Sequence, residues 1–223
     1  MTDPVSRETA PTEPPRPPEV ARGILGNSLP HAVRYAELLA DAGVVRGLIG
    51  PRETPRLWER HLLNCAVLAD GIPDGAAVAD VGAGAGLPGV VLALGRPDLA
   101  VTLVEPLQRR TEFLTEVVGA LGLDRVEVVR ARAEELHGVR FFGTVVSRAV
   151  APLPRLLRWC LPLVAPGGQM LAMKGASAEE ELSKAAATLR RLNAGPAEVV
   201  WFGQEILDPP TTAIRVAASV RRG

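Results

Sequence analysis

Short apolar runs alternate with longer segments of helical period through most of the chain after Gly71. The runs are rich in Val, Leu and Ala, as in strands that are buried on both faces. We expect such strands near residues 77–81, 100–105, 126–130, 143–148 and 169–173. The segments between them repeat apolar residues at helical spacing, which predicts helices near 88–94, 107–121, 153–163 and 178–193. This alternation indicates β-α units around a parallel sheet.

The end of the chain departs from this alternation. Val199–Phe202 and Ala213–Val220 are β-branched or aromatic runs, joined by a segment too short to hold a crossover helix. They are therefore expected to pair antiparallel. The whole predicts a Rossmann-like α/β fold with a mostly parallel, seven-stranded sheet that ends in an antiparallel hairpin. That organisation resembles the class I methyltransferases, which use S-adenosylmethionine (SAM).

Three regions follow from these patterns. Residues 1–18 hold six of the 20 prolines and almost no large apolar side chain, so they are expected as a disordered tail. Residues 19–70 are expected as a small helical extension packed on the main domain, residues 71–223. The extension contains a helix from Leu29 to Ala42, and a second helix with Thr54 as N-cap and Pro55 in its first turn.

The second helix of the extension carries an apolar stripe, and a later helix has a capping signal. Trp58, His61, Leu62 and Cys65 follow the spacing of one helix face. For His61 the stripe favours a satisfied histidine in the core. Further along the chain, Ser177 and Glu180 have the spacing of a capping box at the start of the helix near 178–193.

The charge balance limits how the protein can meet nucleic acid. Among 223 residues, 25 are basic and 25 acidic, so the net charge is zero and no global positive field exists. Arg125–Arg158 holds seven arginines against three glutamates, and Arg46–Arg60 holds four against two. Two interpretations stay open: these arginines form a local basic patch, or they are scattered and solvated.

Composition points to a folded protein of a reducing compartment. The chain is 47% hydrophobic and 22% charged, which excludes full disorder. Its two cysteines, Cys65 and Cys160, form neither a disulfide scaffold nor the close pairs of a zinc site, so no metal is expected. No apolar stretch approaches a membrane span or a signal peptide. We expect a cytoplasmic protein, a monomer, with no membrane partner.

A glycine-rich turn follows the first strand, in the segment VADVGAGAGLPGV. Asp80 closes the strand, and the glycines allow positive φ and close approach of a ligand; they are Gly82, Gly84 and Gly86. The same segment also spells the dinucleotide pattern G-x-G-x-x-G, so a nicotinamide cofactor competes with SAM. Glu105 ends the next strand, where either ribose would meet a carboxylate.

Two features favour SAM over a dinucleotide. Pro88 removes an N–H from the helix start, where a pyrophosphate needs it. Asp80 suits a ligand with an ammonium group, as the methionine part of SAM has. After the third strand, Ala133 and Glu134 fall at the carboxyl edge of the sheet, where they can face the adenine.

The residues after the fourth strand narrow the choice of methyl acceptor. Ser147, Arg148 and Ala149 stand where enzymes of exocyclic amines have an Asn/Asp-Pro-Pro-aromatic turn. Cys65 and Cys160 lie on predicted helices, whereas C5 methylation of a pyrimidine needs a cysteine in a loop. A guanine N7 acceptor needs no general base, because its lone pair is free at neutral pH. The pattern therefore favours an enzyme that positions its methyl acceptor over one that removes a proton from it.

Five segments in order resemble the bacterial guanine-N7 methyltransferases of small-subunit ribosomal RNA, the glucose-inhibited division protein B type. They are ERHLLN (Glu59 to Asn64), DVGAGAGLPG (Asp80 to Gly89), ARAEEL (Ala131 to Leu136), VVSRA (Val145 to Ala149) and MKG (Met173 to Gly175). The resemblance implies methylation of a guanosine in the 530 loop of 16S rRNA, free or in a small-subunit precursor, with SAM as donor.

The resemblance also assigns roles to single residues. Cofactor contacts would fall on Gly82, Leu87, Glu105, Ala133, Glu134 and Arg148. RNA would face Arg60, His61, Asn64 and Lys174. Arg148 and Lys174, at the carboxyl ends of neighbouring strands, are the candidate catalytic residues, through positioning alone. Where the family commonly has Asp-Ser, this chain has Asn64-Cys65, which puts a carboxylate role there in doubt.

Two other functions remain open from the sequence. A SAM-dependent enzyme for a small molecule would share the cofactor half and differ in the acceptor pocket. A non-catalytic module of the dinucleotide type would bind NAD and leave SAM alone.

Overall fold

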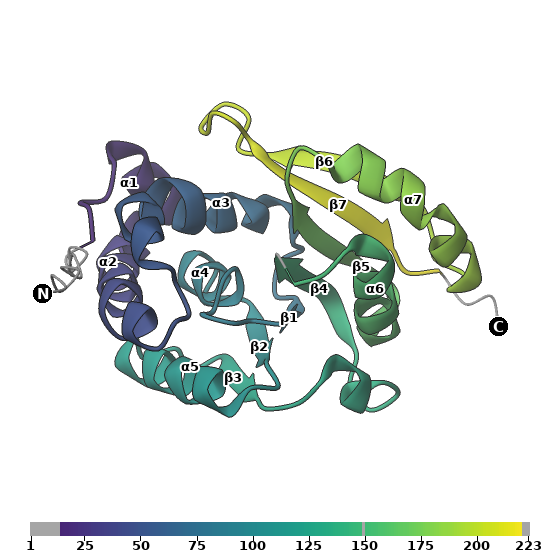
Figure 1. The fold of residues 1–223 in the computed structure, drawn as a ribbon, viewed down its shortest axis with the longest axis horizontal. Helices are drawn as coiled ribbons and strands as arrows, with labels where there is room; N and C mark the ends of the chain where they lie inside the picture. Colours follow the sequence, from purple (N-terminus) through teal and green to yellow (C-terminus); the bar gives the residue numbers. More distant parts are fainter. Residues whose placement is uncertain (1–13, 149, 220–223) are drawn as a thin grey trace, which may run out of the picture.

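The computed structural model describes residues 14–148 and 150–219, and its centre is one seven-stranded sheet (Figure 1). The strand order is β3-β2-β1-β4-β5-β7-β6. The strands are β1 Ala77–Val81, β2 Ala100–Val104, β3 Val126–Val129, β4 Phe142–Arg148, β5 Val164–Lys174, β6 Ala197–Phe202 and β7 Thr211–Ala217. The first five are parallel, and β7 runs antiparallel to both β5 and β6. The predicted sheet and its closing hairpin are confirmed.

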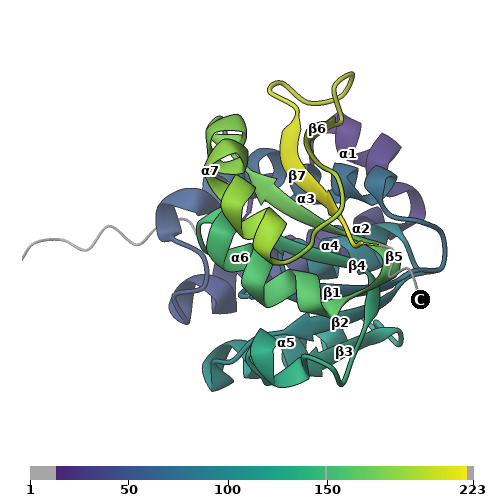
Figure 2. The same ribbon diagram turned by 90° about the vertical axis from the view of Figure 1, so that its right-hand side faces the viewer.

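Helices cover both faces of the sheet. They are α1 Glu19–Leu25, α2 Leu29–Leu38, α3 Leu63–Ala66, α4 Gly89–Gly95, α5 Gln108–Ala120, α6 Leu153–Cys160 and α7 Ala178–Arg191. One apolar cluster joins the sheet to α1 through α5, and a second joins it to α6 and α7. Figure 1 shows α1, α2 and α3 on one side of the molecule, and Figure 2 shows α6 and α7 together on another. The strands need apolar residues on both faces for this reason.

The chain reverses its direction of winding between β1 and β4. From β1 the order runs outward through β2 and β3 on one side, and through β4 and β5 on the other. The carboxyl ends of β1, β2 and β4 therefore meet at a topological switch point, where open α/β sheets place their ligands. Val81 pairs with Val104 at this edge, which sets the glycine loop after β1 beside the end of β2.

The helical extension differs from its prediction at its second helix. Pro51–Arg56 forms a 3-10 helix with Pro51 at its start, and Leu57–Leu62 is a wide π-helical turn that runs into α3. Pro55 therefore lies inside the 3-10 helix, and Thr54 is buried instead of capping. The expected start is wrong because Pro51, which also has its φ fixed for a helix, begins the helical run earlier. The predicted apolar stripe is correct, since Trp58, His61, Leu62 and Cys65 are all buried.

Two smaller predictions differ from the structure, and two predicted segments lie partly outside the described residues. The helix from Leu29 continues past α2 as a π-helical turn, Leu39–Gly43. At α7, Ser177 makes no capping bond, because its φ of −85° and ψ of 9° are not the extended geometry of an N-cap; its hydroxyl contacts Glu181 instead. Residues 1–13 of the predicted tail lie outside the described residues, as does Val220 at the end of the predicted last strand.

The described end of the proline-rich segment is not free of the core. The indole nitrogen of Trp58 donates a hydrogen bond to the carbonyl of Pro15, at 2.8 Å. Trp58 is 2% exposed, so residues 14–18 lie against a core side chain. The described part of the predicted tail therefore contacts the core at Pro15, and the first helix begins directly after it, at Glu19. Among the described residues, no helix combines the length and apolar character required to cross a membrane.

Candidate active site

The glycine loop between β1 and α4 needs its glycines. Gly82, Gly84 and Gly86 have φ values of +74°, +58° and +97°, a region that other residues rarely adopt. A Cβ at Gly86 would also lie 2.5 Å from Val90 and 2.9 Å from the Tyr35 hydroxyl. A Cβ at Gly84 would meet nothing closer than 3.8 Å, so this glycine faces open space. The loop is thus tight at its ends and open in its middle.

Tyr35 ties the helical extension to this loop. Its hydroxyl donates to the carbonyl of Ala85 at 2.7 Å, and the ring is fully buried in α2. Burial raises the pKa of Tyr35 well above its usual value, so the hydroxyl keeps the proton that it donates. Sequence reasoning missed this contact. The available signal was that the chain has a single tyrosine and that it lies on the apolar face of its helix.

Glu105 lies at the end of β2 and is 1% exposed. One carboxylate oxygen accepts the N–H of Leu107 at 3.0 Å, and the other accepts the N–H of Gly84 at 3.1 Å. Arg110 approaches the same side chain at 3.4 Å. Glu105 therefore fixes the middle of the glycine loop, and it still has lone pairs for a ligand.

Asp80 lies below the loop and is completely buried. One carboxylate oxygen accepts the N–H of Gly89 at 2.8 Å, and the other has no hydrogen-bond partner among the described residues. Burial raises the pKa of Asp80 to about 7. Gly89 is needed here because a Cβ would collide with Leu103 and with Asp80 itself.

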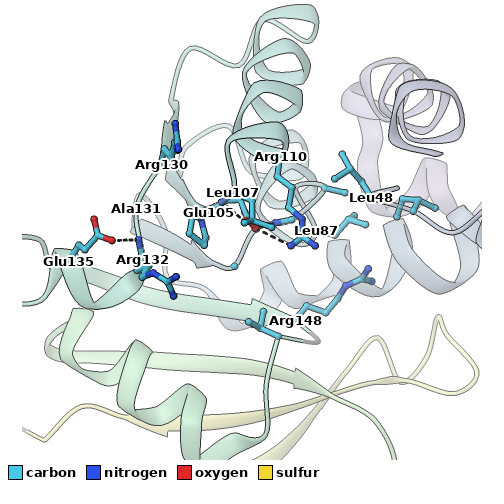
Figure 3. Close-up of a pocket in the computed structure, with 17 residues that line it drawn as sticks. Leu48, Leu87, Glu105, Leu107, Arg110, Arg130, Ala131, Arg132, Glu135 and Arg148 are labelled. Carbon is cyan, nitrogen blue, oxygen red and sulfur yellow. Dashed lines mark hydrogen bonds and ion pairs between the residues drawn. The ribbon is translucent and has the colours of Figure 1, made fainter. Parts of the chain in front are cut away.

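A cavity of about 800 Å³ opens at this edge of the sheet (Figure 3). Figure 3 shows Glu105 beside Arg110, with Arg130, Arg132 and Glu135 toward one end and Leu48 toward the other. The lining comes from the glycine loop, the ends of three strands and the extension: Leu48, Ile49, Gly82, Ala83, Gly84, Ala85, Leu87, Glu105, Pro106, Leu107, Arg110, Arg130, Ala131, Arg132, Glu135, Arg148 and Val150.

The segment after β3 reaches the cavity with different residues from those expected. Ala133–Leu136 is a 3-10 turn that buries Ala133 in the core and leaves Glu134 exposed to solvent. Ala131, Arg132 and Glu135 line the cavity in their place. The Glu135 carboxylate accepts the N–H of Arg132 at 3.1 Å, which holds the turn in this orientation. The sequence placed Ala133 and Glu134 only by their distance from the third strand, and the 3-10 turn was not part of that prediction.

Arg148, at the end of β4, joins the cavity to the extension. Its Nη2 lies 2.8 Å from Nδ1 of His61, and its Nη1 lies 3.8 Å from Sγ of Cys65. Nε2 of His61 in turn lies 2.8 Å from the Glu53 carboxylate. The order Glu53, His61, Arg148 leads from the surface of the extension to the cavity. Sequence reasoning had no signal for the partner of His61, because Glu53 precedes it in a segment that was not expected to be helical.

The remaining predicted residues lie outside the cavity lining. Lys174 is largely buried, donates to the Ala151 carbonyl at 3.0 Å and pairs with Glu181 at 2.7 Å. Asn64 accepts a hydrogen bond from the Thr211 hydroxyl at 3.1 Å. Arg60 is exposed and lies 3.4 Å from Glu53. The structure thus gathers Gly82, Gly84, Leu87, Glu105 and Arg148 at the cavity, leaves Asp80 and Gly86 outside its lining, and holds Lys174 in an ion pair. No cluster of metal-ligating side chains occurs in residues 14–148 and 150–219.

The cavity fits SAM in three respects. Open space over Gly84 leaves room for a ligand close to the backbone. Glu105 offers carboxylate oxygens at the point where the ribose of a nucleoside cofactor lies in such folds. Asp80 does not line the cavity, but its unpartnered oxygen leaves hydrogen-bonding capacity beneath the loop, which suits the ammonium group of a methionine.

The sheet order, the glycine loop after β1 and the carboxylate after β2 together define a class I methyltransferase. Solved structures share this fold. A SAM-dependent O-methyltransferase from Thermotoga maritima superposes with a TM-score of 0.56 and 18% identity, covering 72% of this chain and 66% of that chain. The ribosomal protein L11 methylase from Lactobacillus delbrueckii subsp. bulgaricus gives a TM-score of 0.53 at 16% identity, covering 70% and 77%.

The chain belongs to the GidB family, described as rRNA small subunit methyltransferase G, whose model matches residues 28–207. Relatives named ribosomal RNA small subunit methyltransferase G include one from a Nocardioides species, 61% identical over 97% of this chain and 85% of that protein. Another, from Streptomyces avermitilis, is 58% identical over 93% and 88%. The protein is therefore an enzyme with SAM as its methyl donor, and the alternative of a dinucleotide-binding module is wrong.

Proposed function

We propose that the protein transfers the methyl group of SAM to N7 of a guanosine in the 530 loop of 16S rRNA. Family membership supports ribosomal RNA of the small subunit as the acceptor, because the relatives carry that activity in their names. The particular base and atom come from the resemblance of the five sequence segments. The proposal favours this acceptor over a small molecule.

The observation that carries the proposal is the set of charged side chains that line the cavity. Of the lining residues, Glu105 and Glu135 are carboxylates, and both are engaged by backbone N–H groups. The cationic lining residues are Arg110, Arg130, Arg132 and Arg148. A cavity whose carboxylates are held by backbone N–H groups, and that also contains several arginines, suits an acceptor that loses no proton before attack and that brings phosphates with it.

Each group has a role in this proposal. SAM, when bound, supplies an electrophilic methyl group on a sulfonium centre. The Gly82–Ala85 loop holds it through close backbone approach, and Glu105 accepts hydrogen bonds from its ribose hydroxyls. Arg148 orients the acceptor base against it from the end of β4. Leu48 and Ile49 contribute apolar surface that excludes water from one side of the cavity.

Contacts with the RNA backbone are assigned to exposed arginines. Arg60 and Arg132 are exposed, and Arg132 is also at the cavity. Lys174 would have to leave Glu181 before it could reach a phosphate, and His61 is turned toward Arg148. With few aromatic residues, 4% of the chain, the protein is expected to recognise RNA by shape and phosphate more than by stacking. The proposal includes a cytoplasmic protein, because bacterial ribosomes assemble in the cytoplasm, and the monomer that the sequence analysis expects.

Tritium transfer from labelled SAM tests the acceptor class. Ribosomal RNA from cells that lack the protein should gain label in 16S rRNA and none in 23S rRNA. Arg132→Ala should weaken binding of this RNA and reduce the salt slope of binding by about one. Arg191→Ala is the matched control, an exposed arginine at the end of α7, and should change neither. SAM binding without any label in 16S rRNA would favour the small-molecule alternative.

A further inference from the structure

We propose that Glu53 and His61 are positioning residues that hold the Arg148 guanidinium at the junction of cofactor and acceptor, and that protonation of His61 releases it. The inference rests on the proposed function and names the residues that control the position of Arg148 within that site. It assigns His61 a place behind Arg148, where the family resemblance had it face the RNA. It also adds Glu53, which no motif singled out.

The three side chains come from three separate elements. Arg148 ends β4, His61 lies in the π-helical turn, and Glu53 lies in the 3-10 helix. Both hydrogen bonds are 2.8 Å long, one from Arg148 Nη2 to His61 Nδ1 and one between His61 Nε2 and Glu53 Oε2. His61 is 8% exposed and the Glu53 side chain 31%, so the contact with Glu53 lies where the buried site meets the surface.

The direction of these hydrogen bonds fixes where the proton of His61 lies. A guanidinium has N–H donors and no acceptor, so Nδ1 of His61 must accept from Arg148. A neutral imidazole then carries its proton on Nε2, which donates to the Glu53 carboxylate. Glu53 therefore selects the tautomer that presents a lone pair to Arg148.

The charges around His61 favour the neutral ring. Burial and the Arg148 charge lower the pKa of His61 from its usual 6.5, Arg60 lowers it further, and Glu53 opposes them. The other titratable groups around Arg148 are Cys65, whose pKa burial raises to about 11, together with Tyr35 and Asp80. Near neutral pH, His61 is thus an uncharged acceptor.

Arg148 depends on this acceptor. Its other contact is with Cys65 Sγ at 3.8 Å, a weak one, and within the described ranges no carboxylate pairs with it. When His61 takes a proton at low pH, an N–H of Nδ1 faces the N–H groups of the guanidinium, and two positive charges meet. The contact then becomes repulsive, so Arg148 leaves its position while the glycine loop and Glu105 stay in place.

Three variants separate positioning from folding. Glu53→Ala removes the acceptor of Nε2, and His61→Ala removes the acceptor of Arg148. His61→Asn keeps an oxygen near the place of Nδ1 but cannot titrate. Glu59→Ala is the matched control, because Glu59 is an exposed carboxylate on the same turn as His61. Each is assayed for SAM affinity, and for the single-turnover rate of methyl transfer to 16S rRNA between about pH 5 and about pH 8.

The wild-type rate should rise with pH along a one-proton limb with its midpoint below 6.5, the ordinary pKa of histidine. Glu53→Ala and His61→Ala should slow turnover at neutral pH by about tenfold to a hundredfold through misalignment, with SAM affinity unchanged. His61→Asn should restore most of the rate and lose the acid limb. The inference is overturned if His61→Asn keeps that limb, or if Glu53→Ala turns over as fast as Glu59→Ala.

Nitrogen NMR of the wild-type imidazole gives a readout that is independent of the acceptor. It should find the proton of His61 on Nε2 near neutral pH, with a pKa below that of free histidine. A proton on Nδ1 would contradict the inference whatever the activity shows. Absence of methyl transfer to 16S rRNA, with the Nε2 tautomer present, would instead contradict the proposed function.

Discussion

Removal of the Glu105 carboxylate should weaken SAM binding more than it weakens the fold. In the structure this carboxylate accepts the N–H groups of Gly84 and Leu107 and has lone pairs left for the ribose. Glu105→Ala deletes the ribose contact and also frees the middle of the glycine loop. Both effects weaken the complex with SAM. The ribose loses an acceptor, and the freed loop must be ordered again when SAM binds.

The size of the effect follows from the kind of hydrogen bond that is lost. Bonds to a charged group contribute about 1.5–3 kcal/mol each, so SAM affinity should fall by about tenfold to a hundredfold. Glu105→Gln keeps one acceptor oxygen but turns an NH₂ group toward one of the two backbone donors. It should fall between the wild type and Glu105→Ala.

Calorimetry with SAM measures these affinities, and thermal unfolding checks that each variant is folded. Glu112→Ala is the control, since this carboxylate is exposed on α5 and outside the cavity lining. Affinity for 16S rRNA should stay at the wild-type level in all three variants. Wild-type SAM affinity in folded Glu105→Ala, or an equal loss in Glu112→Ala, would refute the assignment of Glu105 to the ribose.

Four further expectations follow from the structure. Gly84→Val should abolish detectable SAM binding in a folded protein. The φ of +58° at this position strains a β-branched residue, and the side chain enters the space left for the ligand. Normal SAM binding by calorimetry would disprove the loop assignment. Asp80→Asn should alter the pH dependence of urea unfolding. Burial raises the pKa of Asp80 from 3.8 to about 7, so the unfolded chain loses this proton at a lower pH than the folded protein. The stability of the wild type therefore falls as pH rises between those two values. The variant should lack that fall, which is at most about 1.4 kcal/mol per pH unit, and an unchanged slope would show that Asp80 is not its source. Deletion of residues 1–18 should lower Tm by about 2–4 °C, because Trp58 loses its hydrogen bond to the Pro15 carbonyl, worth about 1 kcal/mol net. An unchanged Tm would mean that this contact adds nothing to stability. Lys174→Ala should leave the salt slope of RNA binding unchanged, since Glu181 already pairs with this lysine, and a slope reduced by about one would show that Lys174 reaches a phosphate after all.

The sheet could be predicted from the sequence because its signals are local. An apolar run such as Ala77–Val81 marks a strand by itself, and the spacing of the runs requires crossover helices. The glycine loop and Glu105 could be found for the same reason, since the class places them at fixed strand ends. The amino half of β5 was missed because Gly167 and Gly168 interrupt its apolar pattern.

The contacts that complete the site could not be predicted in this way. Tyr35 reaches Ala85 across 50 positions, and Arg148 reaches His61 across 87. Such pairs depend on how the extension packs on the sheet, which periodicity does not encode. Lys174 was expected at the site from its strand end and from the family resemblance. Its neighbour Glu181, one element later, provides a partner that neither of these shows.

The central claim is methylation of N7 of one guanosine in the 530 loop, and chemical mapping of that atom tests it most directly. N7-methylguanosine, unlike guanosine, becomes open to strand scission by aniline after borohydride reduction. Small-subunit RNA from cells without the protein, treated with the protein and SAM, should be cut at a single guanosine in that loop. Tritium incorporated from SAM without scission there, or scission at another guanosine, would contradict the account.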